Sequence, residues 1–377
     1  MKLLRVWAVA RKECLHILRD WRSLVMAVAI PVLLLTLYGY ALTLDVDNVP
    51  LAVWDQSRTD TSRRLVAAFG GSRYFSVRRH VGTYAELQAA IDRREVLLGL
   101  VIPTDFAARV DSGRPAAAQL LVDGSDSNMA TIAIGYAQSV AAGFSQDLVL
   151  AAQRRLGQPP LAVPVELRPR VWYNPELESR NYIVPGIIAM IMMILAALLT
   201  SLTVAREWER GTMEQLISTP IRPSELVLGK LLPYFAIGMV DVVLAVVMGQ
   251  VLFGVPLRGS VPLLFAVAAV FLVGALSMGM LISILARNQL VASQSAMILT
   301  FVPAFLLSGF VFAIANMPEA IRAVTYFIPA RYFVSLMKGI YLKGVGLETL
   351  AVDAALLAAF AVAVVLLAVV KFKKKLE

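Results

Sequence analysis

The sequence is poor in the residues from which most catalytic and metal centres are built. Its 377 residues include one cysteine, Cys14, and two histidines, His16 and His80. A single thiol excludes an intramolecular disulfide, and so few Cys and His side chains argue against a zinc or histidine-based centre. The phosphate-binding pattern Gly-x-x-x-x-Gly-Lys-Ser/Thr is also missing, which excludes ATP hydrolysis by that chemistry in this chain. We therefore expect no metal, no cofactor and no catalytic residue here.

Charged residues are scarce as well. They make up 16% of the chain, whereas hydrophobic residues make up 59% and the mean hydropathy is +0.73. These values indicate an integral membrane protein. The net charge of +9 lies outside residues 45–178, which hold 14 Arg, no Lys and 15 acidic residues. A nucleic-acid-binding protein gathers its basic residues on one face, but here they flank apolar runs, so we expect no nucleic-acid partner.

One polar segment, residues 206–230, lies between the apolar runs Ile183–Ala205 and Leu231–Phe253. Each run is long enough to cross a bilayer. Thr212 with Gln215 fits a capping box that starts a helix at 213–218, and prolines limit how far this helix continues. Ser224 followed by Glu225 predicts the next helix start. These residues alone fit two interpretations equally well: a helix that docks to another protein, and an ordinary solvated loop between two spans.

The hydrophobic pattern predicts an α-helical membrane protein with six spans. Apolar and basic residues at helical spacing predict an N-terminal interfacial helix, not a cleavable signal peptide. The expected spans are 23–44, 179–205, 231–253, 261–286, 290–313 and 350–370. The expected remaining segments are the interfacial helix 1–22, an inserted domain 45–178, the loop 206–230, an outer loop 314–349 with short re-entrant or surface helices, and a tail 371–377.

The sequence of the inserted region 45–178 predicts a folded α/β domain. Its predicted strands are Leu51–Trp54, Phe75–His80, Val96–Ile102 and Ala118–Val122, and its predicted helices are Thr61–Phe69, Tyr84–Arg93, Thr104–Asp111 and Asn128–Leu156. Alternation of strands with helices predicts partly parallel strands. The order of the strands cannot be read from the sequence, and the arginine pairs of this domain are interpreted as solvated faces.

The positive charges predict the orientation. With the N-terminus inside, the cytoplasmic segments carry fifteen Lys and Arg residues and the short outer loops carry five. Because positive charge stays on the cytoplasmic side, both termini and the loop 206–230 are expected there, and residues 45–178 outside.

Several motifs together resemble one family. The stretch Glu207-x-Glu209-x-Gly211-Thr212-x-Glu214-Gln215-Leu216, followed by Thr219-Pro220 and Gly229-Lys230, is similar to the cytoplasmic loop of type-2 ATP-binding-cassette (ABC) transporter permeases. Three other stretches resemble motifs of the bacterial drug-efflux-like subgroup: Trp172-Tyr-Asn-Pro175 with Val184-Pro-Gly186, Leu307-Ser-Gly309 with Met317-Pro318, and Pro329-Ala-Arg-Tyr-Phe333 with Lys338-Gly339 and Lys343-Gly344. The resemblance covers nearly the whole chain.

The resemblance implies a transmembrane exporter subunit that moves drug-like or other amphipathic substrates by alternating access. It implies two copies of a separate ABC ATPase, which would bind ATP and magnesium, and a homodimer or a heterodimer with a related permease. The lipid bilayer of a bacterial inner membrane is the remaining expected partner, and the sequence leaves open whether the outer domain also meets a periplasmic adaptor. The alternative is a membrane-anchored sensor or assembly protein whose outer domain binds a ligand without transport.

The resemblance assigns ten residues to ATPase docking and coupling: Glu207, Glu209, Gly211, Thr212, Glu214, Gln215, Leu216, Pro220, Gly229 and Lys230. Among them we expect Gly211, Thr212 and Pro220 to shape the turn, and Glu209, Glu214 and Leu216 to contact the ATPase. Five further residues are candidates for the substrate path: Met190, Met193, Asp241, Pro303 and Ser308. A carboxylate within a span is costly and often functional, although a neutral, hydrogen-bonded Asp241 fits equally well.

Overall fold

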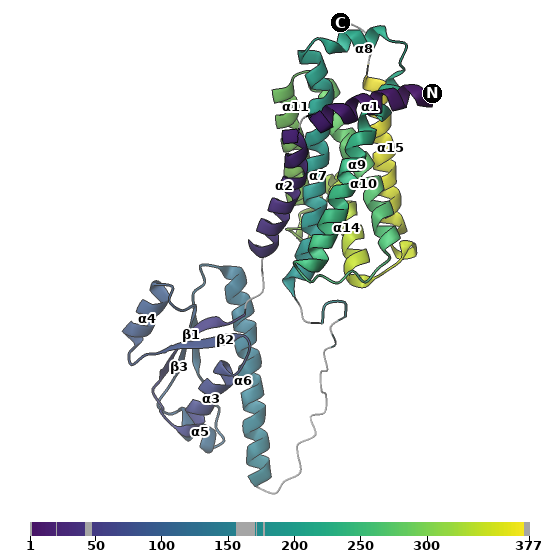
Figure 1. Ribbon diagram of the computed structural model, residues 1–377. Coiled ribbons are helices and arrows are strands. Elements are labelled where there is room, and N and C mark those ends of the chain that lie inside the picture. Colours follow the sequence, from purple (N-terminus) through teal and green to yellow (C-terminus); the bar gives the residue numbers. More distant parts are fainter. Residues whose placement is uncertain are drawn as a thin grey trace. The chain divides into compact units, whose positions relative to one another are not determined.

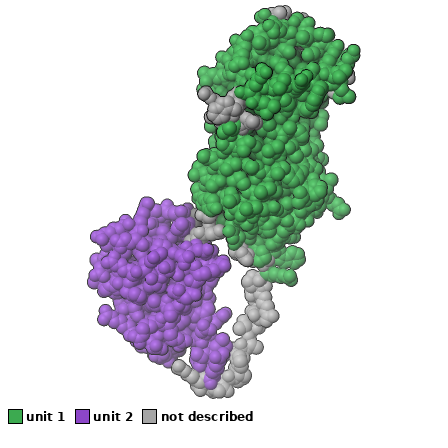
Figure 2. All heavy atoms as spheres, in the orientation of Figure 1, with its two compact units in different colours: residues 1–43, 170–377 green, residues 44–169 purple. Residues whose placement is uncertain are grey.

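The computed structural model describes residues 2–19, 21–41, 47–155, 170, 172–175 and 178–372. The chain divides into two compact units, one formed by residues 1–43 with 170–377 and the other by residues 44–169 (Figure 2). The first unit is built from helices. The second combines helices with a four-stranded sheet.

Long apolar helices form the first unit. Within the described ranges, five are long and apolar enough to cross a membrane: α7 (Ser179–Glu209), α9 (Pro223–Val251), α10 (Val261–Ala286), the stretch Gln289–Leu307, and α15 (Leu347–Lys371). A sixth helix, α2 (Trp21–Ala41), contains the shorter apolar stretch Ala27–Ala41. The fold is therefore that of a helical membrane protein, with α7 enclosed by α2, α9, α10 and α14 (Pro329–Lys338) (Figure 1).

Two elements, α1 (Leu3–Arg19) and the short helix α8 (Thr212–Ser218), lie at one end of this unit and are not part of the bundle of long helices. Helix α1 runs across the end of the bundle at which α8 also lies (Figure 1). Leu3 and Trp7 of α1 are 77% and 63% exposed, whereas Ala10 is buried against the bundle. Exposed apolar side chains on a helix of this amphipathic pattern are typical of the membrane interface.

The helix bounds differ from the expected ones in two places. The predicted fifth span 290–313 is wrong at its end, because the stretch consists of α11 (Gln289–Ala296), a π-helical turn (Met297–Phe301) and α12 (Val302–Leu307), and Ser308 ends it. The predicted loop 206–230 is also shorter, since α7 continues to Glu209 and α9 already begins at Pro223. Between the fifth stretch and α15 lie four short helices: η2 (Ile314–Asn316), α13 (Glu319–Thr325), α14, and the π-helical η3 (Gly339–Lys343).

The second unit is a small α/β domain. Its strands are β1 (Val49–Asp55), β2 (Phe75–His80), β3 (Leu98–Ile102) and β4 (Gln119–Val122), in the spatial order β2-β1-β3-β4. Strand β1 pairs in parallel with β2 and with β3, and β4 is antiparallel to β3. All four strands were predicted within a few residues of their observed bounds.

Helices cover both faces of this sheet. On one face, α3 (Asp60–Gly70) and α6 (Ser127–Arg155) contribute Leu65, Phe69 and Ala133 to a core with β1 and β3. On the other, α4 (Tyr84–Asp92) packs Leu87 and Ala90 against the opposite side of the same strands. A short helix, α5 (Phe106–Asp111), follows β3. Because apolar side chains alternate between the two faces of β1, each face receives its own core.

Candidate coupling region

The turn into α8 is made by a glycine. Gly211 adopts φ 69° and ψ 3°, a left-handed conformation that favours glycine. The chain therefore enters α8 with Thr212 already helical, and the predicted capping box between Thr212 and Gln215 is wrong. The Thr212 hydroxyl instead donates to the carbonyl oxygen of Glu207 at 3.4 Å. Helix α8 itself covers the residues predicted for it.

The start of α9 holds the N-terminus of the chain. Pro223, not Ser224, is its first residue, a position that suits proline because no helical N–H is lost there. Glu225 accepts hydrogen bonds from the backbone N–H of Arg222 at 3.0 Å and of Lys2 at 2.7 Å. Arg5 pairs with the same carboxylate at 3.6 Å and donates to the carbonyl oxygen of Pro220. The start of α1 is thus fixed to the first turn of α9 and to the segment that precedes it.

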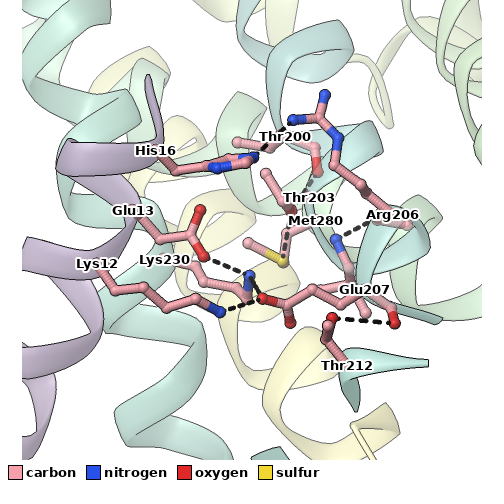
Figure 3. A network of polar contacts seen from close by, with 12 residues as sticks. Lys12, Glu13, His16, Thr200, Thr203, Arg206, Glu207, Thr212, Lys230 and Met280 are labelled. Carbon is pink, nitrogen blue, oxygen red and sulfur yellow. Dashed lines mark hydrogen bonds and ion pairs between the residues drawn. The ribbon is translucent and has the colours of Figure 1, made fainter. Parts of the chain in front are cut away.

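A second attachment is a buried cluster of charges. Lys230 of α9 is 1% exposed, and its Nζ lies 2.7 Å from Glu13 Oε1 of α1 and 2.9 Å from Glu207 Oε1 of α7 (Figure 3). Lys12 of α1 adds a contact to the same oxygen of Glu207 at 2.9 Å. Three helices distant in sequence therefore share one ion-pair network, and removing one partner leaves a buried charge without compensation.

The ion pairs are accompanied by close packing. A Cβ at Gly229 would lie 2.7 Å from Val9 Cβ and 3.0 Å from the Val6 carbonyl oxygen, so glycine lets α1 approach α9. Next to the cluster is a cavity of about 130 Å³ lined by residues that include Glu207 and Tyr234. Glu207 Oε2 is buried and has no hydrogen-bond partner among the described residues. A cavity of this size has room for water beside that oxygen.

The proposed path residues are found in the interior of the helical unit. Met190, Met193 and Ser308 are buried, and Pro303 is half-buried in α12. Ser308 Oγ accepts a hydrogen bond from the Phe310 N–H at 3.3 Å. Asp241 is 1% exposed in α9, and its Oδ1 has no hydrogen-bond partner in the part of the chain that is described.

A basic side chain is also enclosed at the opposite end of the bundle. Lys338 of α14 donates from Nζ to the Gly309 carbonyl oxygen at 3.0 Å and lies 3.6 Å from the centre of the Tyr182 ring. Burial lowers the pKa of Lys338 to about 8. The Gly309 carbonyl dipole and the face of the Tyr182 ring attract its ammonium group, whereas burial favours the neutral amine.

The family follows from comparison with known proteins. Residues 21–370 match the model of the ABC-2 family of transporter proteins. The chain belongs to the ABC-2 transporter family. It is 39% identical to the probable multidrug ABC transporter permease YbhS of Escherichia coli strain K12, over 99% of this chain and 98% of YbhS. It is 33% identical to YbhR, described in the same words, over 91% of each chain, and 29% identical to the inner membrane transport permease YhhJ over 86% of this chain and 85% of YhhJ.

Membership fixes the protein's general role. This ABC-2 chain is the transmembrane permease of an ABC exporter, and the family implies an ABC ATPase as partner. Permeases of this family lack the ATPase site, in agreement with the missing phosphate loop.

The structure divides the ten docking candidates of this ABC-2 permease into three groups. Glu207, Gly229 and Lys230 attach α1 to α7 and α9, and all three are buried. Glu209 is hydrogen-bonded within the chain, because its carboxylate accepts from the Gln289 N–H at 2.8 Å and from the Gln289 amide. The remainder belong to α8 and its flanking turns: Gly211, Thr212, Glu214, Gln215, Leu216 and Pro220. Of these, Glu214 and Gln215 are exposed, whereas Leu216 is half-buried.

Several residues of the region were not predicted as site residues. They are Arg5, Lys12 and Glu13 of α1, and Glu225 of α9. One signal was present in the sequence: Glu13 is the single acidic residue within α1 and has basic residues on both sides, Lys12 before it and His16 after it. An acid in an otherwise basic amphipathic helix indicates a specific partner more than a membrane-facing position.

Proposed function

We propose that this permease exports drug-like or other amphipathic molecules and receives the energy of ATP hydrolysis through α8. The observation that carries the proposal is the exposed surface of α8, with Glu214 and Gln215, on a short helix connected directly to two long ones. The substrate class is supported by the multidrug description of YbhS and YbhR.

The coupling step follows from the attachments of α8. Closure of two ATPase subunits on ATP and magnesium would push α8, which has only Arg210 and Gly211 between it and α7. The cluster of Lys230, Glu13 and Glu207 holds α1, α7 and α9 together, so the push would move them as one rigid body. Such motion would open the path alternately to the two sides of the membrane.

The arrangement in the membrane is part of the same proposal. Six spans, α2 included, would place both termini and α8 in the cytoplasm and residues 45–178 outside. The charge difference between the two sets of loops and the position of α1 and α8 at one end of the bundle support it. We further propose a bacterial inner membrane location, a homodimer or a heterodimer with a related permease, and contact of the outer domain with a periplasmic adaptor.

Charge reversal on α8 tests the coupling proposal. The variant Glu214→Lys should lose stable association with the cognate ABC ATPase and should lose substrate-stimulated ATP hydrolysis, because a like-charge contact replaces a complementary one. The measurement is copurification of the two subunits, followed by ATPase assays with and without substrate. Glu319→Lys of α13 is the matched control, since it makes the same charge change at another exposed position. Equal association and hydrolysis in both variants would refute docking through α8.

A transport assay distinguishes an exporter from a membrane-anchored sensor. Reconstituted permease and ATPase should accumulate a fluorescent amphipathic cation in inverted vesicles when ATP is added. A membrane-anchored sensor would bind its ligand without accumulation and without dependence on ATP.

A further inference from the structure

The α/β unit contains a cavity that the transport function does not explain. Its volume is about 450 Å³, and it opens where the parallel strands β1 and β2 end. The lining residues are Val53, Asp55, Arg58, Arg63, Val66, His80 and Val81. Sheets of this open α/β type bind ligands outside the carboxyl ends of their strands. The position of the cavity in the fold is therefore one where small molecules are bound.

The polar part of the cavity is basic, and its charges are not neutralised internally. No hydrogen bond or ion pair joins the side chains of Arg58, Arg63 or His80 to another residue in the described part of the chain, and all three are exposed. The only acid in the lining, Asp55, is occupied: Oδ1 accepts from the Arg58 N–H at 3.0 Å and Oδ2 from the Ser62 hydroxyl at 2.7 Å. Two guanidinium groups and an imidazole are therefore available to bind a ligand.

The rest of the lining is apolar. Val53 is buried in β1, Val81 is buried just after β2, and Val66 of α3 is half-buried. Arg63 and Val66 are one helical turn apart, so one face of α3 supplies both a cation and an apolar contact. Guanidinium groups form strong, geometrically specific hydrogen bonds with carboxylates and phosphates. A cationic rim above apolar side chains suits a ligand in which an anionic group is joined to a small apolar body.

We propose that this cavity binds an organic anion of that kind, its phosphate or carboxylate paired with Arg58 and Arg63 and hydrogen-bonded to His80, and its apolar part on Val53, Val66 and Val81. The arginines of this domain are then not all solvated surface charges. The proposed site includes no residue of α8 and does not involve the ATPase. The anion-binding proposal and the coupling proposal can therefore be refuted separately.

The site can be tested by isothermal titration calorimetry, in which phenyl phosphate is titrated into the full-length permease in detergent. Arg63→Gln and Arg58→Asn should each weaken binding by about tenfold or more, as loss of one charge-assisted hydrogen bond predicts. Asparagine is chosen at position 58 because Arg58 has φ 51°, a left-handed conformation that asparagine tolerates. Arg64→Gln is the matched control, since Arg64 directly follows Arg63 in the same helical turn, is exposed and does not line the cavity. Phenol and inorganic phosphate should both bind more weakly than phenyl phosphate.

Absence of phenyl phosphate binding by the unchanged protein would overturn the proposal, as would equal weakening in Arg63→Gln and Arg64→Gln. The natural anion can be a free solute or a lipid headgroup, and vesicles distinguish the two. Weaker phenyl phosphate binding in vesicles of phosphatidylcholine with phosphatidylglycerol than in phosphatidylcholine alone would show that a lipid headgroup competes for the cavity. Equal binding in both would assign it to a free solute.

Discussion

Two groups of basic side chains in this protein show opposite arrangements. Lys230 is 1% exposed and lies within 3 Å of two glutamates, whereas Arg58 and Arg63 are exposed and have no ion pair with another described residue. Burial of a charge is costly unless the charge is paired. The Lys230 cluster is therefore structural, and removal of any one of its charged side chains should destabilise the protein. Unpaired, solvated arginines contribute little to stability and remain available for binding.

The largest difference between the two groups should appear when one charge is removed. Lys230→Met leaves Glu13 and Glu207 facing each other, and we expect a loss of about 3–5 kcal/mol in the free energy of unfolding. Denaturant unfolding of the purified permease in detergent measures it. The double variant Glu13→Gln with Lys230→Met should lose less than the sum of the two single variants, because the two residues are in contact. Additive losses would show that the ion pair is not the source of the effect.

A second prediction concerns the packing that surrounds the buried charges. Gly229→Ala should destabilise the protein by about 1–3 kcal/mol, because the new methyl group would overlap Val9 and the backbone of α1. Gly135→Ala in α6 is the control, since nothing lies within 4 Å of the added methyl group. There alanine should stabilise the helix by about 0.5–1 kcal/mol. Opposite signs in the two unfolding curves are expected; two changes of the same sign would refute the close approach of α1 to α9.

The smallest effect is expected in the outer domain. Arg63→Gln should change the free energy of unfolding by less than about 0.5 kcal/mol, because the side chain is exposed and its charge is unpaired in the described structure. The same unfolding assay applies, with Arg64→Gln alongside. A loss comparable to that of Lys230→Met would mean that Arg63 makes a structural contact and would remove the contrast between the two groups.

The sequence predicted the elements better than the contacts between them. The strands and helices of residues 47–155 follow from local alternation and from turn residues, and β2 was predicted at its observed bounds, Phe75–His80. The Lys230 cluster was not predictable in this way, because Glu13 and Lys230 are 217 residues apart and no local pattern links them. The arginine cavity depends similarly on the order of β1 and β2 in the sheet, which the sequence left open.

Errors arose where backbone geometry overrides side-chain preference. Thr212 has the residue type of a cap, but the left-handed Gly211 brings the chain into the helix one residue earlier. The fifth span was predicted to continue through 308–313 because these residues are apolar, yet Gly309 adopts φ 80° shortly after α12 ends. Hydropathy detects the environment of a segment and not the point at which its helix terminates.

The two attachments of α1 also restrict how this protein can move within its bilayer. Helix α1 is joined to α9 at Lys2 and at Glu13 and to α7 at Lys12, so it cannot move independently of these two helices. Its exposed Leu3, Leu4 and Trp7 lie on the free side. With α1 at the membrane interface, as its amphipathic pattern predicts, a tilt of α9 would move these apolar side chains through the headgroup layer, and the lateral pressure of the lipids would contribute to the free energy of the transport cycle.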